Sequence, residues 1–391
     1  MKFIQFTLFT VFALMNMTSC LDSEKTVALN RRSLRADSLL AHLRFSSSNG
    51  YMFGHHDATL YGRERVNGEE RSWTFTEGRC DVKDVCGDYP AIISFDLGHI
   101  EIGDSLSLDF VPFDMIRKEM VAHYRRGGIV TASWHLNNPL SGGSSWIEND
   151  TVALSSKEST VASILEGGSN HNKFQVWLSR LADFLNSVKT EDGEKIPILF
   201  RPWHEHTGNW FWWGASHCTP EQYVDLWKMT RKALDQSGAD HLIYAYSPGM
   251  ECGGDSAIYL ERYPGNDLVD LLGVDAYEYL DEGMSLEDGN ARYAENLNTI
   301  LSMLTAVGQK HDKPVAVTEM GFEGIPYERW WTEVADSILS KHPVAYGLVW
   351  RNVKGDVTHH YAPYPGHSSV PDFIEFYNLE RTLFLKDICK K

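Results

Sequence analysis

Arg201-Pro-Trp-His-Glu-His-Thr-Gly-Asn-Trp-Phe-Trp-Trp-Gly214 directly follows the apolar stretch Ile196-Pro-Ile-Leu-Phe200. The apolar stretch is typical of a buried strand, and the polar run begins where that strand would end. The run places one carboxylate, two imidazoles and a guanidinium beside four tryptophans and a phenylalanine. Flat aromatic faces beside an acid/base group are poor material for a core and favour a site that holds a sugar ring.

Short apolar β-type runs recur along the whole chain. Besides the run at 196–200, they lie at 51–54, 91–95, 128–132, 242–245, 271–274, 315–318 and 346–350. Their continuous apolar character indicates strands that are buried on both faces, as in a parallel sheet. Stretches with helical spacing lie between them, at 113–126, 172–188, 220–234, 292–308 and 327–340. Eight strands alternating with helices predict an α/β fold, a single (β/α)8 barrel.

Polar or aromatic residues follow every predicted strand. They are His55-His56-Asp57, Asp96, Trp134-His135-Leu136-Asn137-Asn138, Arg201–Glu205, Ser247-Pro248, Asp275-Ala276-Tyr277, Glu319-Met320-Gly321 and Arg351-Asn352. In such barrels the active site is assembled at the carboxyl ends of the strands. The pattern therefore predicts a catalytic rim.

Two glutamates stand out on this rim. Glu205 ends the fourth predicted strand and Glu319 ends the seventh, so both side chains can face one substrate at the mouth of the barrel. Retaining glycoside hydrolysis needs such a pair, with the two carboxyl groups about 5–5.5 Å apart. A structural salt bridge is the ordinary alternative for a single glutamate at a strand end, and it suits a pair flanked by Trp and His less well.

The motifs around these glutamates resemble those of glycoside hydrolase family 26, whose best-known members are β-1,4-mannanases. The resemblance rests on 201–214 together with Trp134-His135, Gly273-Val-Asp-Ala-Tyr277, Thr318-Glu-Met-Gly321 and Val349-Trp-Arg351, which occur in the family's order. It covers nearly the whole chain after the amino-terminal segment. It implies a (β/α)8 fold, a retaining double displacement, and neither a metal nor a cofactor.

The resemblance also implies a role for individual residues. Glu205 corresponds to the acid/base and Glu319 to the nucleophile, and His204 to a histidine that contacts the nucleophile and the sugar. A donor at His204 would favour the ionised form of Glu319, whereas exclusion of water by the Trp-rich loop would keep Glu205 protonated. The other expected substrate-binding residues are His135, Trp210, Asp275, Tyr277, Trp350 and Arg351. For Asp275 two interpretations stay open, a hydrogen bond to a sugar hydroxyl or an ion pair with Arg201 below the site.

Composition and the remaining motifs argue against several other classes of function. A net charge of -17 argues against a nucleic-acid partner, while 43% hydrophobic and 23% charged residues are ordinary for a folded protein. His204-Glu205-His206 lacks the HExxH spacing of a zinc site, and no Gly-x-Ser-x-Gly elbow supports a serine hydrolase. We expect a monomer that acts on β-mannan, galactomannan or manno-oligosaccharides.

The amino terminus has the pattern of an export signal. Lys2 precedes the apolar stretch 3–15, and Met17-Thr-Ser-Cys20 resembles a bacterial lipobox with Met in place of the usual Leu. We therefore expect residues 1–20 to form a signal peptide and lipobox, removed up to Cys20, and residues 21–391 to form one catalytic domain. Lipidated Cys20 would anchor the protein in the periplasm or cell envelope. Standard secretory cleavage nearby is the alternative.

The cysteines leave two possibilities open. Cys80 with Cys86, and Cys218 with Cys252, are placed so that each pair could form a disulfide in an oxidising compartment, with Cys389 left over. Five reduced thiols are the alternative.

Three functions for the whole protein follow from these observations. The leading one is a retaining endo-β-1,4-mannanase, with the release of mannobiose left open. The second is a related β-glycanase acting on xylan or mixed-linkage glucan. The third is an inactive carbohydrate-binding lipoprotein, against which the presence of both Glu205 and Glu319 argues.

Overall fold

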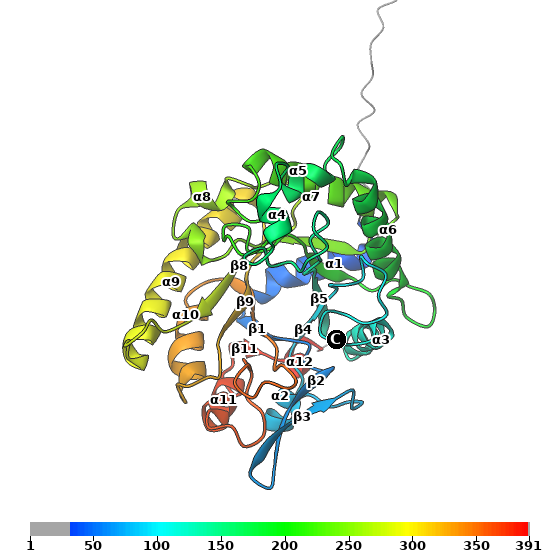
Figure 1. Ribbon diagram of the computed structural model, residues 1–391. Coiled ribbons are helices and arrows are strands. Elements are labelled where there is room, and N and C mark those ends of the chain that lie inside the picture. The colour runs from blue at the N-terminus through cyan, green and yellow to red at the C-terminus, as the bar shows by residue number, and fades with distance from the viewer. Residues whose placement is uncertain (1–31, 390–391) are drawn as a thin grey trace, which may run out of the picture.

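The computed structural model describes residues 32–389 of the chain (Figure 1). The predicted signal peptide and lipobox fall outside the described residues. Eight parallel strands form a closed barrel, in which β10 pairs back onto β1. The barrel strands are β1 (Tyr51–His56), β4 (Ile92–Asp96), β5 (Ile129–Ser133), β6 (Ile198–Arg201), β7 (Leu242–Tyr246), β8 (Leu271–Glu278), β9 (Val315–Phe322) and β10 (Val344–Val349). The predicted (β/α)8 barrel and its eight strands are confirmed.

Helices surround the barrel on the outside (Figure 1). They are α1 (Leu34–Ser46), α2 (Asp81–Cys86), α3 (Phe113–Arg125), α4 (Thr151–Ser155), α5 (Thr160–Ile164), α6 (His171–Ser187), α7 (Pro220–Gln236), the 3₁₀ turn η1 (Met250–Cys252), α8 (Ser256–Leu260), α9 (Leu286–His311), the π-helix η2 (Trp330–Asp336), α10 (Ser337–Leu339), α11 (Val370–Tyr377) and α12 (Leu385–Ile388). The helix expected at 327–340 is a π-helical segment that continues into α10, and α9 begins six residues before the expected start.

Local sequence explains the long helices. Thr219 and Gln222 form a capping box at the start of α7, with Pro220 in the first turn. The stripe Phe174, Trp177, Leu178, Leu181 and Leu185 of α6 is buried, as its spacing predicts.

The barrel interior is apolar toward the amino-terminal ends of the strands and polar at their carboxyl ends. Met52, Ile92 and Leu199 lie in a buried cluster to which α1 contributes Ala36 and Leu43. Because successive side chains alternate between the two faces of a strand, Arg201 points to the same side as Leu199, two residues further along β6. The strands thus carry apolar interior side chains at one end and functional ones at their carboxyl ends.

Several elements lie outside the predicted pattern. An antiparallel hairpin is formed by β2 (Tyr61–Val66) and β3 (Glu69–Thr74), and the short β11 (Thr382–Leu383) pairs with β1. All five cysteines of the described residues are free thiols, so neither suggested disulfide is present. Among the helices of residues 32–389, none is long and apolar enough to cross a membrane.

Asp336 connects three segments at the amino-terminal end of β1. Its carboxylate, 3% exposed, accepts a hydrogen bond of 2.8 Å from the hydroxyl of Tyr51 and one of 2.7 Å from Nε of Arg381. Tyr51 begins β1, and Arg381 directly precedes β11. One carboxylate therefore fixes the first barrel strand to the carboxyl-terminal part of the chain.

We expect Asp336→Ala to lower the free energy of unfolding by about 2–3 kcal/mol, because the buried Tyr51 hydroxyl and the Arg381 guanidinium both lose their acceptor. Urea unfolding measured by circular dichroism tests this. Asp336→Asn keeps an acceptor for Tyr51 and should lose less. Equal stability of Asp336→Ala and the unaltered protein would show that the contacts of Asp336 do not hold these segments together.

Candidate active site

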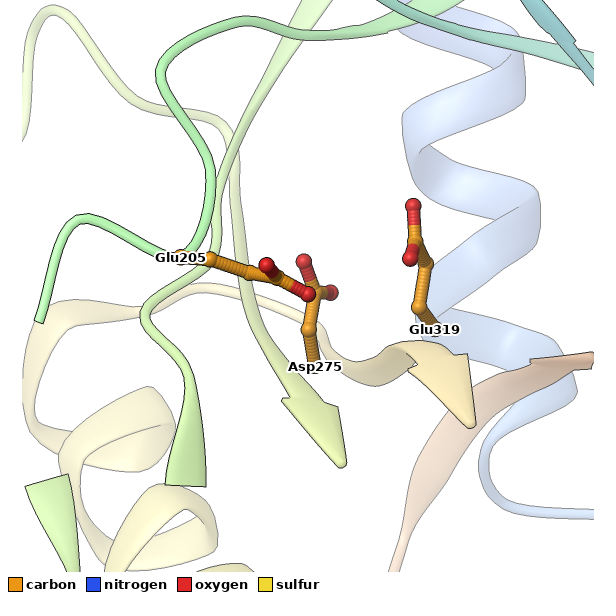
Figure 2. Close-up of side chains that lie close together, drawn as sticks. All are labelled: Glu205, Asp275 and Glu319. Atoms are coloured by element: carbon orange, nitrogen blue, oxygen red, sulfur yellow. The ribbon is translucent and has the colours of Figure 1, made fainter. Parts of the chain in front are cut away.

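Three carboxylates meet at the mouth of the barrel (Figure 2). Asp275 lies in β8, Glu319 lies in β9, and Glu205 belongs to the loop after β6. One oxygen atom from each of the three lies within 4.8 Å of the others. β6 and β9 are the fourth and seventh barrel strands, so the structure brings the two predicted glutamates together from opposite strands.

Glu319 is held by a donor on each of its oxygens. The Nη2 atom of Arg201 donates to Oε1, and the hydroxyl of Tyr277 donates to Oε2 at 2.6 Å. Arg201 also donates to Asp275 at 2.6 Å, and all three members of this Arg–Asp–Glu group are at most 3% exposed. A carboxylate with charge-assisted donors on both sides is fixed in one orientation.

A bulge between β8 and β9 places Glu319 beside Asp275. The parallel register shifts after Val274, so that Asp275 is opposite Glu319 and Thr318 becomes an extra residue on β9. The Thr318 hydroxyl closes the bulge by hydrogen bonds to the Val274 carbonyl and, at 2.6 Å, to Asp275. Bulges redirect side chains in this way next to active sites.

Glu205 occupies a different environment. It has a left-handed backbone with φ of 53°, and one of its oxygens accepts a hydrogen bond of 2.7 Å from Nε1 of Trp210. Burial raises the pKa of Glu205 well above its usual range, and the charges of Asp275 and Glu319 raise this pKa further. The hydrogen bond from Trp210 acts in the opposite direction. Glu205 is therefore the carboxyl group most favoured to hold a proton.

Of the four tryptophans in 201–214, only Trp210 lines the cleft that opens beside Glu205. Trp203, Trp212 and Trp213 are at most 1% exposed and pack edge-to-face on one another, so the expectation that this run is poor core material is wrong for these three. Their indole N–H groups are nevertheless paired, and that of Trp213 donates to the carbonyl of His204 at 2.8 Å. Buried tryptophans thus hold the backbone next to Glu205 in place.

Gly208 makes room for Trp210. A Cβ at this position would lie 2.2 Å from the Trp210 ring, so no larger residue fits there without moving the ring. The close approach of the glycine backbone holds the indole where it reaches Glu205.

A chain of hydrogen bonds connects Asp96 to His204. Asp96 contacts Nδ1 of His135 at 2.6 Å, and Nε2 of His135 lies 2.9 Å from Nε2 of His204. Burial alone would raise the pKa of Asp96, but the charge and hydrogen bond of His135 outweigh it and hold this pKa well below its usual range. Burial and the nearby Arg201 charge lower the pKa of His204, which is therefore a neutral imidazole.

These hydrogen bonds correct one expectation from the sequence. His204 contacts His135, and the donors on Glu319 are instead Arg201 and Tyr277. Of the two interpretations left open for Asp275, the structure shows the ion pair with Arg201.

Trp350 and Arg351 directly follow β10, the eighth barrel strand. The Trp350 ring is stacked on His56 with centroids 3.9 Å apart and meets His135 edge-to-face. Arg351 pairs with Asp109, which comes from the loop after β4. The hydroxyl of Tyr61 donates to Asp57 at 2.6 Å beside this pair.

Sequence reasoning did not assign roles to Asp96, Asp109 or Tyr61. Asp96 carried a signal, since it directly follows a predicted strand. Asp109 and Tyr61 lie in loop and hairpin segments, where no periodicity marks them, and Asp109 is 242 residues from its partner Arg351.

A cleft of about 690 Å³ opens beside Glu205. Glu205, Trp210, Asp275 and Tyr277 line its inner part. The three clustered carboxylates have oxygen atoms close enough to hold a cation, and in this structure the Arg201 guanidinium supplies positive charge to two of them.

The site has the parts that a retaining glycoside hydrolase needs. Glu205 and Glu319 each place one oxygen within 4.8 Å of the other, which fits the close pair of a retaining enzyme better than the carboxyl spacing of about 6.5–9.5 Å in inverting enzymes. One of these groups is fixed by cationic and hydroxyl donors, and the other is desolvated beside an indole. Two carboxyl groups with such opposite environments are suited to the roles of nucleophile and acid.

Known proteins share this architecture. A β-mannanase of glycoside hydrolase family 26 from Bacteroides ovatus superposes with a TM-score of 0.83 at 44% identity, over 92% of this chain and 98% of that one. A mannan endo-1,4-β-mannosidase from Bacillus subtilis is 29% identical over 71% of this chain and 71% of its own length.

A mannan endo-1,4-β-mannosidase from Bifidobacterium adolescentis is 31% identical over 83% of this chain, which spans only 32% of that longer protein. The family model described as glycosyl hydrolase family 26 matches residues 30–339. The match covers most of the barrel, including both glutamates, and the chain belongs to glycosyl hydrolase family 26.

Proposed function

We propose that the protein is a retaining endo-β-1,4-mannanase that hydrolyses mannan and galactomannan by double displacement. The observation that carries this proposal is the pairing of Glu205 and Glu319, with oxygens within 4.8 Å of each other and opposite environments. The choice of mannan is supported by the relatives from B. ovatus, B. subtilis and B. adolescentis, all of which are named as mannanases or mannosidases acting on mannan.

In the first step Glu205 donates its proton to the glycosidic oxygen while a Glu319 oxygen attacks the anomeric carbon. The bond to the leaving sugar breaks, and a covalent glycosyl–Glu319 ester forms. In the second step Glu205, now ionised, takes a proton from water, whose oxygen displaces Glu319 from the anomeric carbon. The anomeric configuration is inverted twice and hence retained.

Arg201 determines which carboxyl group carries the proton. Its guanidinium donates to Asp275 and Glu319, and Glu205 receives a hydrogen bond only from neutral Trp210 among the described residues. Arg201 therefore stabilises negative charge on Asp275 and Glu319 rather than on Glu205. When Glu319 becomes an ester and loses its charge, one of the charges that raise the pKa of Glu205 disappears, and Glu205 is better able to act as a base.

The remaining residues bind the sugar on either side of this pair. Trp350, backed by His56, offers a flat surface beside the carboxylates, and Arg351 with Asp109 presents charged hydrogen-bonding groups next to it. His135, oriented by Asp96, is directed toward the same space as His204. These residues bind the sugars on the non-leaving side, and Trp210 contacts the leaving sugar.

The unaltered protein should release reducing sugar from mannan and not from xylan or lichenan, and Glu205→Ala and Glu319→Ala should each lower turnover of mannan by at least about 10²–10⁴-fold. A reducing-sugar assay on the three polysaccharides measures this. Activity on xylan or lichenan without activity on mannan would show that the substrate is that other polysaccharide. Activity on none of the three would favour a binding protein.

Azide separates the two roles, because it can attack the anomeric carbon in place of the Glu319 carboxylate or in place of the water of the second step. On an aryl β-mannobioside, which needs little acid assistance, Glu205→Ala with azide should give the β-glycosyl azide. Glu319→Ala should give the α-glycosyl azide. The opposite assignment of anomers by NMR would exchange the two roles.

The pH dependence follows from the pKa of Glu205. Because Glu205 must be protonated in the first step, kcat/KM should fall as pH rises through its raised pKa. Trp210→Phe removes the hydrogen bond that lowers this pKa, so the alkaline limb of kcat/KM should move to higher pH by about one unit. Trp146→Phe, at an exposed tryptophan that packs on Phe211, is the control. An alkaline limb that stays in place or moves to lower pH would contradict this account.

We further propose that the protein is exported and anchored through lipid on Cys20, which leaves residues 21–391 as the catalytic domain. The support is the sequence pattern of Lys2, the apolar stretch 3–15 and Met17-Thr-Ser-Cys20. Produced in a Gram-negative host with an alkyne-labelled fatty acid, the protein should carry the label and sediment with membranes. Cys20→Ser lacks the thiol and should lose both properties. An exported but unlabelled, soluble protein would indicate ordinary secretory cleavage instead.

A further inference from the structure

The cleft beside Glu205 continues well beyond the catalytic carboxylates. Its outer part is lined by the segment around η1, by Tyr279 after β8, and by one side of α9. η1 and α9 both pack against β8, and Figure 1 shows α9 on the outside of the barrel on the side of this strand. Glu319, Trp350 and Arg351 do not line this cleft. It therefore lies on the Glu205 side of the carboxylate pair.

The direction of the cleft fixes which part of a polysaccharide it receives. The acid protonates the oxygen that leaves, so the leaving sugars lie on the side of Glu205, whereas the sugar that becomes bound to Glu319 lies on the other side. The cleft is consequently the path of the leaving part of the chain. Neutral sugar rings are bound by aromatic faces and by polar groups that bond their hydroxyls.

Tyr279 has the features of an aromatic platform in this path. It is 64% exposed, although it follows directly on a buried strand. It lies two residues beyond Tyr277, which contacts Glu319, so it is about 7 Å further out along the same chain direction.

Arg292 braces the tyrosine. Its guanidinium lies 5.0 Å from the centroid of the Tyr279 ring and donates to the Tyr279 carbonyl at 2.6 Å. Asp281 accepts a further hydrogen bond from the same guanidinium. An exposed ring held by a cation over one of its faces has less freedom to lose when a sugar stacks on it, which favours binding.

Polar side chains of α9 face the same space. Arg292, Glu295, Asn296 and Thr299 follow each other at intervals of three, one and three residues, and all line the cleft. This spacing places them on one face of the helix. Glu251 of η1 lines the cleft as well, so acceptors and donors for sugar hydroxyls line the same cleft as Tyr279.

We propose that Tyr279, braced by Arg292, forms a distal binding subsite for a sugar of the leaving part of the chain, beyond the sugar next to Trp210. The inference rests on the proposed hydrolysis of mannan and adds to it. This subsite makes the protein favour bonds that have at least two sugars on their leaving side.

The test compares cleavage of reducing-end-labelled mannohexaose with cleavage of an aryl β-mannobioside, whose aryl group does not extend to Tyr279. Tyr279→Ala should lower kcat/KM for mannohexaose about 3- to 10-fold relative to that for the aryl substrate. The cleaved bond should also move toward the reducing end, giving shorter labelled products. Tyr279→Phe keeps the ring and should cleave at the original position, and Arg292→Gln should shift cleavage in the same direction as Tyr279→Ala, to a smaller extent.

Phe45→Ala is the matched control, because Phe45 is a 67% exposed aromatic at the end of α1, remote from the cleft. An unchanged cleavage position in Tyr279→Ala, or an equal loss on both substrates, would overturn the subsite. If the unaltered protein hydrolyses neither substrate, the proposed function fails. If it hydrolyses both and Tyr279→Ala cleaves mannohexaose like the unaltered protein, only the distal subsite fails.

Discussion

The buried guanidinium of Arg201 is the interaction on which the site depends. A cation that is 2% exposed is stable only when it is paired, and its partners are Asp275 and Glu319. Three carboxyl groups share this one cation, because Glu205 lies within 4.8 Å of the other two. They cannot all be ionised at low energetic cost, so one of them keeps a proton. Since Glu205 has no hydrogen bond to the guanidinium among the described residues, the proton is held there, and catalytic roles follow from the pairing.

The barrel supplies the conditions for this pairing. Apolar side chains fill the barrel at the amino-terminal ends of its strands and α1 packs against them, so apolar packing lies beneath Arg201. The bulge at Thr318 turns Glu319 toward the guanidinium, and Tyr277, two residues after Asp275 on the same strand, reaches the other oxygen of Glu319. Each contact comes from a strand end, which explains why a rigid sheet can hold two like charges so close together.

The barrel and the two glutamates could be predicted because both leave local signals. Strands buried on two faces are continuous apolar runs, and each run is followed at once by its functional residues. The contacts of His204 could not be predicted, because they depend on the position of His135, which follows another strand. The pairing of Arg351 with Asp109 likewise joins residues that are far apart in sequence. The hairpin of β2 and β3 was missed because it is rich in charged residues, such as Arg65, Glu69 and Arg71, and shows no apolar run.

The Trp-rich run also explains how a strained backbone is maintained at Glu205. Trp203 and Glu205 both have φ near 55°, a conformation that costs non-glycine residues on the order of 1–3 kcal/mol each. Packing of Trp203 against Trp212 and Trp213 offsets this cost. The Trp203 carbonyl accepts a hydrogen bond from Tyr223, and the amide of Glu205 donates to Ser247, both at 2.8 Å. A relaxed backbone would turn the Glu205 side chain away from Glu319. The buried tryptophans therefore act on catalysis without touching the sugar, by keeping the acid in a conformation that it would not adopt alone.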